Sequence, residues 1–158
     1  MTTAATTFTD LDRVLGELGY DYETRTAQTE DGYILNVIHI TGKTGEAKVN
    51  PADSKGTVLF QHGDLMDGTN WLSGYLDFYQ AKSPLLDIVD EGYDVWLGNN
   101  RGTRYSRGHT SLNPAIDPEL YYDYTWADMS KDVAAEILAI KEATGQEKIF
   151  YVGYSQGT

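Results

Sequence analysis

The sequence predicts an α/β fold, with a mainly parallel sheet and helices on its faces. Largely apolar runs at 57–61, 93–97 and 149–152 are typical of parallel strands that are buried on both faces. A segment with helical periodicity, residues 125–145, precedes the last of these runs. Strands that alternate with helices along a chain favour a parallel sheet.

The first forty residues predict a helix followed by a hairpin. Apolar residues recur at helical spacing over 11–18, and Gly19 follows as a stop signal. Residues 22–29 and 33–40 have the pattern of strands, more strongly in the second segment, and the turn Glu30-Asp31-Gly32 separates them. We therefore expect a hairpin at the start of the sheet.

A longer helix is predicted before the last strand. Thr125 and Asp128 form a capping pair at its start, and Gly145 ends it. Residues 70–79, which contain several aromatic side chains, are expected to form irregular or helical cover. Four apolar residues at helical spacing are expected to line one face of the long helix: Met129, Val133, Ile137 and Ile140.

Length and composition bound the class of protein. The 158 residues fit a single domain, but an incomplete one, because α/β domains of this kind often run to about 200–250 residues or more. The formal net charge of −12 argues against nucleic acid as a partner, since phosphate binding needs a cationic face. The chain has no cysteine, which excludes disulfides, thiolate catalysis and zinc–thiolate sites.

The N-terminal residues do not predict export. Residues 1–10 are rich in threonine and lack the basic start and apolar core of a signal peptide. No apolar run approaches the length of a bilayer span, so no transmembrane segment is predicted. The cellular location is left open.

The most informative chemical pattern is Gly153-Tyr154-Ser155-Gln156-Gly157, directly after the apolar run 149–152. In a nucleophile elbow, a strand turns sharply into a helix and exposes a serine at the apex, and flanking side chains would clash with the neighbouring strand and helix. The N–H of the next residue, Gln156, then faces a developing oxyanion. Taken alone, this five-residue pattern also fits an ordinary turn.

A second pattern fits the same mechanism. Gln61-His62-Gly63-Asp64 follows an earlier predicted strand, and the second N–H of an oxyanion hole comes from the loop after such a strand. Asp64 stands at the position that would supply it. The alternative is an ordinary strand-to-loop turn that uses Gly63.

Several motifs occur in one order between Gly19 and Thr158: 30–35 (EDGYIL), 61–63 (QHG), 70–71 (NW), 92–99 (GYDVWLGN), 101–109 (RGTRYSRGH) and 151–158 (YVGYSQGT). In this order they resemble the acid lipase family, which includes gastric and lysosomal acid lipases and plant-type relatives. The resemblance implies an α/β-hydrolase that cleaves triacylglycerol or steryl esters through a Ser-Asp-His triad, with neither a metal nor another cofactor. Members of the family are often secreted or lysosomal.

The resemblance also assigns roles to individual residues. Ser155 would be the nucleophile, and the backbone N–H groups of Asp64 and Gln156 would form the oxyanion hole. Two departures from the family are Tyr154, in place of a common histidine, and Asp64, in place of leucine. A backbone donor tolerates the exchange at position 64, but an ionised carboxylate there would oppose negative charge in the transition state.

The triad acid and base are expected after the serine in chain order, and the sequence given has only three residues after Ser155. The resemblance makes His62 a structural residue of the oxyanion strand and His109 a loop residue, and His39 is expected to be an ordinary strand residue. Without a base a serine hydroxyl is poorly nucleophilic. We therefore expect the 158 residues to be a truncated piece of the enzyme that is inactive alone.

Two functions remain open. The first is hydrolysis of lipid esters, and the second is a non-catalytic protein that binds a lipid or a partner, with association through an exposed sheet edge. Arg101, Arg104 and Arg107 could bind a carboxylate or phosphate. Pairing with the surplus acidic side chains is the expectation that we favour.

Overall fold

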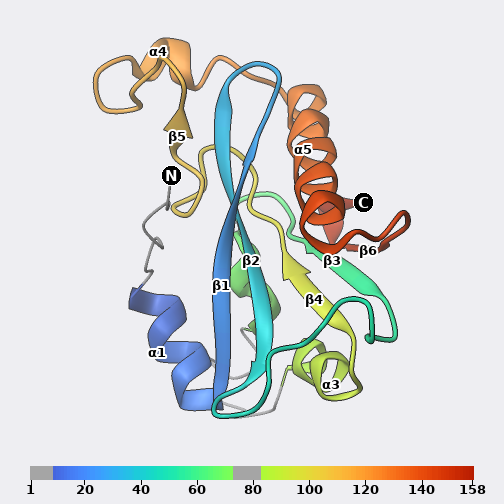
Figure 1. Cartoon of the computed structure of the whole chain (residues 1–158). Coiled ribbons are helices and arrows are strands. Elements are labelled where there is room, and N and C mark those ends of the chain that lie inside the picture. Colours follow the sequence, from blue (N-terminus) through green and yellow to red (C-terminus); the bar gives the residue numbers. More distant parts are fainter. Residues whose placement is uncertain (1–8, 73–82) are drawn as a thin grey trace.

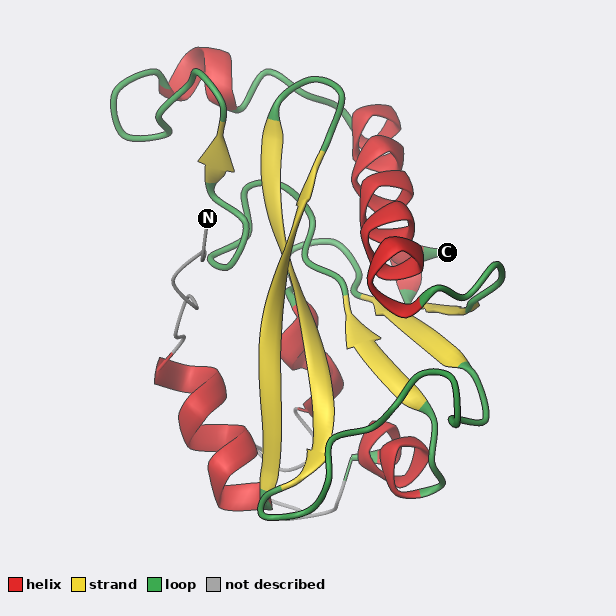
Figure 2. Cartoon of the chain, in the orientation of Figure 1, coloured by secondary structure: helices red, strands yellow, loops and turns green. Residues whose placement is uncertain are grey.

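A mixed sheet organises the chain (Figures 1 and 2). The structure is a computed structural model that describes residues 9–72 and 83–158. Among these residues the strands are ordered β1-β2-β4-β3-β6, and β5 also pairs with β2. The strands are β1 (Tyr20–Gln28), β2 (Tyr33–Lys43), β3 (Thr57–Gln61), β4 (Asp94–Leu97), β5 (Gly108–His109) and β6 (Phe150–Gly153).

Helices connect and cover these strands. The α-helices of the described residues are α1 (Thr9–Leu18), α3 (Pro84–Asp90), α4 (Pro118–Tyr121) and α5 (Trp126–Thr144). Short 3₁₀ helices form at Gly68–Leu72 and Ser155–Gly157. The predicted cover at 70–79 is thus seen only at its start, and the rest lies outside the described residues.

The predicted α/β fold is confirmed, and the predicted hairpin opens the sheet. The three apolar runs form parallel neighbours, since β3 pairs in parallel with both β4 and β6. The sheet is more mixed than the sequence predicts, because β2 is long enough to pair antiparallel with β1, β4 and β5. A long hairpin strand beside the parallel strands therefore makes three of the five strand pairings among the described residues antiparallel.

The core lies on both faces of the sheet. Val58 and Phe60 of β3 pack with α1 and α3 on one face, while Leu59 packs on the other face beneath α5. In β4, Trp96 likewise faces the α5 side, and its two neighbours face the other. This double coverage explains why these strands have apolar runs instead of an alternating pattern.

The long helix begins and ends where the sequence predicts. Asp128 accepts a hydrogen bond from the Thr125 N–H at 2.9 Å, and Gly145 ends the helix in the left-handed conformation at φ 70°. Of the four apolar residues predicted to line one face of this helix, Ile140 is fully buried and the other three are partly buried. The buried positions of α5 include two acidic residues and are Asp132, Ala135, Glu136 and Ile140.

The last strand forms as predicted, but it is not buried on both faces. Phe150, Tyr151 and Val152 remain 59%, 40% and 36% exposed. In the described part of the chain β6 pairs with β3 alone, so its other edge has no neighbouring strand. Among the described residues, the β6 edge of the sheet is therefore exposed.

Candidate active site

The predicted serine lies at a sharp turn between β6 and the following 3₁₀ helix. Ser155 has φ 54°, a left-handed conformation that is uncommon for residues other than glycine. Its side chain is exposed. The Tyr154 N–H donates to the Gln61 carbonyl at 3.1 Å, which fixes the turn against the end of β3. This is the backbone strain and exposure that a nucleophile elbow requires.

Both flanking glycines are needed for close packing of the backbone. A Cβ on Gly153 would lie 2.0 Å from the Gly157 carbonyl oxygen, across the turn. A Cβ on Gly157 would lie 2.7 Å from the carbonyl oxygens of both Gln61 and His62. Side chains at either position would therefore force the elbow away from the end of β3.

The second predicted pattern is brought against the elbow. A Cβ on Gly63 would lie only 3.0 Å from the Ser155 Cβ, so the loop after β3 and the serine are in contact. Asp64 and Gln156 line one cavity of about 390 Å³, which Ser155 itself does not line. In the turns and loops of the described residues, no backbone carbonyl accepts a hydrogen bond from either N–H. Two donors are thus available beside one cavity.

The loop at Asp64 is strained and open. The exposed Asp64 carboxylate accepts a hydrogen bond from the Leu65 N–H at 3.0 Å. Leu65 has φ 59° and is almost fully exposed. An apolar side chain in a left-handed conformation with no packing partner is unusual, and such strain gathers at functional loops.

All three histidines have both ring nitrogens engaged. Buried His62 has Nδ1 2.7 Å from the Gly63 carbonyl oxygen, and its Nε2 accepts from the Asn100 N–H at 3.1 Å. Burial lowers the pKa of His62, which keeps the ring neutral. His109 binds backbone groups of its own loop and of Asp31, and His39 lies between two carboxylates. None of these contacts involves Ser155.

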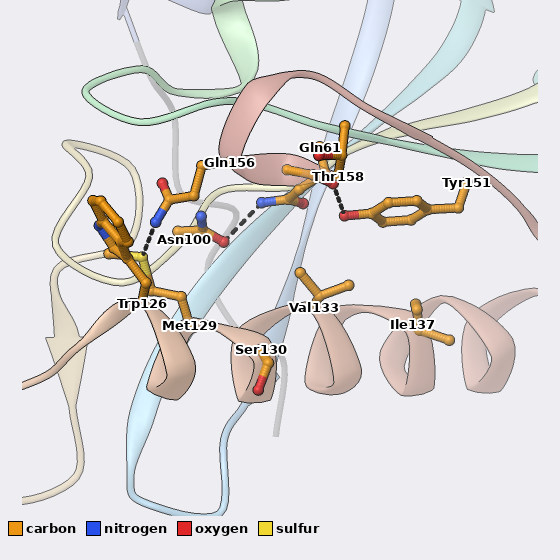
Figure 3. A pocket seen from close by; sticks show the side chains of 11 residues that line it. Gln61, Asn100, Trp126, Met129, Ser130, Val133, Ile137, Tyr151, Gln156 and Thr158 are labelled. Atoms are coloured by element: carbon orange, nitrogen blue, oxygen red, sulfur yellow. Dashed lines mark hydrogen bonds between the residues drawn. The ribbon is translucent and has the colours of Figure 1, made fainter.

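A second cavity lies between α5 and the elbow (Figure 3). It has a volume of about 380 Å³, and Met129, Val133 and Ile137 line its helical side. Gln156 crosses it to donate to the Met129 sulfur at 3.0 Å. Three of the four residues of the predicted apolar stripe therefore face this cavity. Periodicity detects such a stripe but does not tell a cavity wall from a core.

The expected pairing of arginine with acidic side chains is confirmed for two of the three arginines. Arg101 is buried and binds Asp31 and Asp132 at 2.8 and 2.7 Å. Its guanidinium also lies 4.0 Å from the ring centroid of Tyr33. Although burial opposes it, hydrogen bonding from Arg101 lowers the pKa of Asp31, whereas burial raises the pKa of Asp132.

The other two arginines are exposed. Arg104 binds Asp10 at 2.7 Å and Asp67 at 2.8 Å. Arg107 has a weaker contact, a 3.4 Å hydrogen bond to the Tyr122 hydroxyl. The described residues contain no group of three or more His, Asp or Glu side chains that could hold a metal ion. Across the same residues, no helix is both long and apolar enough to cross a membrane.

The sheet, the helices on its two faces and the elbow define the class as an α/β-hydrolase. Family models agree with this class. Residues 56–158 match the alpha/beta hydrolase fold, and residues 12–75 match the partial alpha/beta-hydrolase lipase region. This chain belongs to the alpha/beta-hydrolase fold family.

Several similar proteins are lipases. Lipase member M of Mus musculus is 38% identical over 96% of this chain and 34% of that protein. Triacylglycerol lipase 2 of Arabidopsis thaliana is 41% identical over 89% of this chain and 32% of that protein. Lysosomal acid lipase/cholesteryl ester hydrolase of Homo sapiens is 36% identical over 94% of this chain and 36% of that protein. The predicted resemblance to the acid lipase family is thus confirmed, and the chain spans about a third of the length of these relatives.

A solved structure supports the fold independently. The Pyrococcus furiosus esterase Pf2001 superimposes with a TM-score of 0.59 at 19% sequence identity. The match covers 99% of this chain and 46% of the esterase. At this identity the likeness establishes the fold alone.

Proposed function

We propose that this chain carries the nucleophile and the oxyanion hole of a serine hydrolase that acts on triacylglycerol or steryl esters. The observation that carries the proposal is the exposed Ser155 at φ 54°, on a turn packed against the loop 62–64. The substrate class follows the relatives, whose names include triacylglycerol lipase and cholesteryl ester hydrolase.

The mechanism would begin with attack of Ser155 Oγ on the ester carbonyl carbon, while a base takes the hydroxyl proton. The carbonyl oxygen becomes an oxyanion, and the N–H groups of Asp64 and Gln156 stabilise it. Collapse breaks the ester C–O bond, and the alcohol leaves with the proton. Water then hydrolyses the acyl-serine, which releases the fatty acid and restores the hydroxyl.

The base is not one of the histidines of this chain. His39, His62 and His109 each have both ring nitrogens bonded to groups other than Ser155. We therefore propose that the triad acid and base are supplied from outside these 158 residues and that the 158-residue chain alone is inactive. On this proposal, residues 1–158 form a single, incomplete α/β-hydrolase domain.

A fluorophosphonate probe tests the proposal, because it reacts covalently with an activated serine. In a product of the length of the relatives, we expect a single adduct on Ser155, located by peptide mass spectrometry. The 158-residue chain, which lacks a base, is expected to react far more slowly. An adduct on another serine, or none in a folded product of full length, would contradict the assignment of Ser155.

A second candidate function is non-catalytic binding by the 158-residue chain. It is favoured by one observation, the exposed apolar side chains of β6 beside the cavity of Figure 3. A lipid or a partner chain would cover this surface. A soluble chain that melts cooperatively, binds fatty-acid vesicles and never reacts with the probe would favour this second function.

A substitution at Asp64 tests the effect of its side-chain charge separately from that of its backbone N–H. Replacing Asp64 with asparagine keeps the N–H donor, and the amide oxygen can still accept from Leu65. It removes a negative charge next to the oxyanion. We expect kcat/KM to rise about three- to tenfold, the effect of about 1 kcal/mol that a nearby charge has at an exposed site. Steady-state kinetics of the full-length product on a short-chain ester at low salt would measure it. An unchanged or lower rate would argue against an oxyanion hole at this loop.

A further inference from the structure

Two buried side-chain oxygens meet at Gly98. Gln61 Oε1 and Glu136 Oε2 are buried, and neither has a hydrogen-bond partner in the part of the chain that the structure describes. The position of a Cβ on Gly98 would lie 2.0 Å from Gln61 Oε1 and 2.5 Å from Glu136 Oε2. Both oxygens thus crowd around one point. An amide oxygen and a carboxylate oxygen are both acceptors, so they repel unless one of them carries a proton.

We propose that Glu136 is a neutral carboxylic acid in the folded chain and donates its proton to Gln61 Oε1, as a positioning residue for the oxyanion loop 62–64. The inferred protonation of Glu136 depends on the contacts around its carboxyl group and not on the proposed function. The positioning role rests on the proposed function, since it concerns the donor at Asp64.

The surroundings of Glu136 favour the neutral acid. Its Oε1 accepts from the Asn99 N–H at 2.7 Å, which leaves Oε2 free to carry the proton. Burial raises the pKa of Glu136 to about 8; the hydrogen bond from Asn99 opposes this, and the charge of Asp132 adds to it. Asp132 forms an ion pair with Arg101. A further ionisable neighbour is Tyr151 of β6, whose pKa burial and Glu136 both raise.

A chain of hydrogen bonds connects Gln61 to the oxyanion loop. Gln61 Nε2 donates to Asn100 Oδ1 at 2.7 Å, and the Asn100 N–H donates to His62 Nε2 at 3.1 Å. His62 Nδ1 therefore carries the hydrogen and donates to the Gly63 carbonyl oxygen at 2.7 Å.

The last bond of this chain sets the direction of the Asp64 donor. The Gly63 carbonyl and the Asp64 N–H belong to one trans peptide group and point in opposite directions. Glu136 thus fixes the Gln61 amide at one end of the hydrogen-bond network, and the Asp64 N–H lies at the other end.

The competing arrangement is an ionised Glu136. It requires the amides of Gln61 and Asn100 to be turned over, so that Gln61 Nε2 donates to the carboxylate. The two arrangements differ in the protons that they bind, and folding stability is linked to proton binding. The pH dependence of stability therefore separates them.

Glu136→Gln is the decisive variant for protonation. A glutamine amide can donate to Gln61 and accept from Asn99, as the neutral acid does, so the variant should fold. In the wild type, a folded pKa raised above the unfolded value means that unfolding releases a proton. Stability should therefore fall as pH rises from about 5 to 8. We expect the unfolding constant of the wild type, relative to Glu136→Gln, to rise about tenfold per pH unit across that window.

Urea denaturation of the 158-residue chain and of the variant, from pH 5 to 8, gives this ratio without any assay of activity. A ratio that is constant over the range means that Glu136 is ionised, and it would overturn the proposal. A ¹³C signal of the Glu136 carboxyl that stays in its neutral position at pH 6 provides a second readout of the same protonation.

The positioning role is tested in a catalytically active product of full length. Glu136→Leu can neither donate to Gln61 nor accept from Asn99. We expect it to lower kcat by up to about 10²-fold with KM little changed, because one oxyanion donor is misplaced. Glu136→Gln should retain kcat. A folded Glu136→Leu variant with normal kcat, in an enzyme that still depends on Ser155, would refute the positioning role.

The two tests fail separately. A full-length product without hydrolysis that depends on Ser155 would refute the proposed function, and the denaturation experiment would still decide the protonation of Glu136. The ¹⁵N shifts of His62 add a structural readout, since Glu136→Leu should disturb the Nδ1–H tautomer while Glu136→Gln preserves it. Identical His62 shifts in all three proteins would contradict the network.

Discussion

Replacing Ser155 with alanine is expected to lower kcat/KM for fatty-acyl esters by about 10⁴-fold or more, in a product that also supplies the acid and the base. The substitution removes the only atom that forms the acyl bond. What remains is substrate binding and the oxyanion donors at Asp64 and Gln156. Hydrolysis of a chromogenic ester and of emulsified triacylglycerol would measure the loss.

Ser111→Ala is the matched control for this experiment. Ser111 is an exposed serine in the loop after β5, where it contacts His109 and not the elbow. It should leave kcat/KM unchanged. If Ser155→Ala folds normally and retains the activity of the wild type, the proposed nucleophile is wrong. If both variants lose activity together, the loss reflects folding and not chemistry.

Replacing Arg101 with methionine is expected to destabilise the chain by about 3–5 kcal/mol. The guanidinium is buried between Asp31 of the hairpin turn and Asp132 of α5, and the Asp132 side chain is completely buried. Removing the cation leaves Asp132 with no opposite charge. The loss is large compared with a typical stability of about 5–15 kcal/mol. Urea denaturation at pH 7 would measure it.

Arg104→Met provides the control, because Arg104 also binds two carboxylates but its side chain is 52% exposed. Exposed pairs contribute about 0–1 kcal/mol, so this variant should lose little stability. The loss in Arg101→Met should shrink in acid, because an unpaired buried Asp132 binds a proton below its raised pKa and becomes neutral. Equal losses in the two variants, or no dependence on pH, would contradict the role of Arg101.

Much of the fold could be predicted because its signals are local. The apolar runs that became β3 and β4 report burial on both faces, and turn and cap residues such as Gly32, Asp128 and Gly145 mark the ends of elements. These signals depend on neighbours in sequence. The order of the strands and the antiparallel partners of β2 do not, because pairing between distant residues leaves no periodic trace in the sequence.

The candidate site was predictable in its residues but not in its surroundings. Gly-x-Ser-x-Gly and the segment 61–64 indicated where to look, and the structure brings Gly63 against Ser155. Asp132 and Glu136 escaped sequence reasoning, because acidic residues on a helix are normally expected to face water. Their burial depends on Arg101 and on the Asn99 N–H, which come from a loop more than thirty residues earlier. The catalytic roles themselves stay predictions.

The Arg101 contacts also bear on the order of events during synthesis. Asp31 leaves the ribosome 70 residues before Arg101, and Arg101 leaves 31 residues before Asp132. The nascent hairpin therefore emerges before the cation that binds Asp31 in its turn. Asp31, Arg101 and Asp132 can come together only after α5 has been translated. We therefore expect β1–β2 pairing early in synthesis to lack the Arg101 contacts, and the turn to reach its native arrangement late.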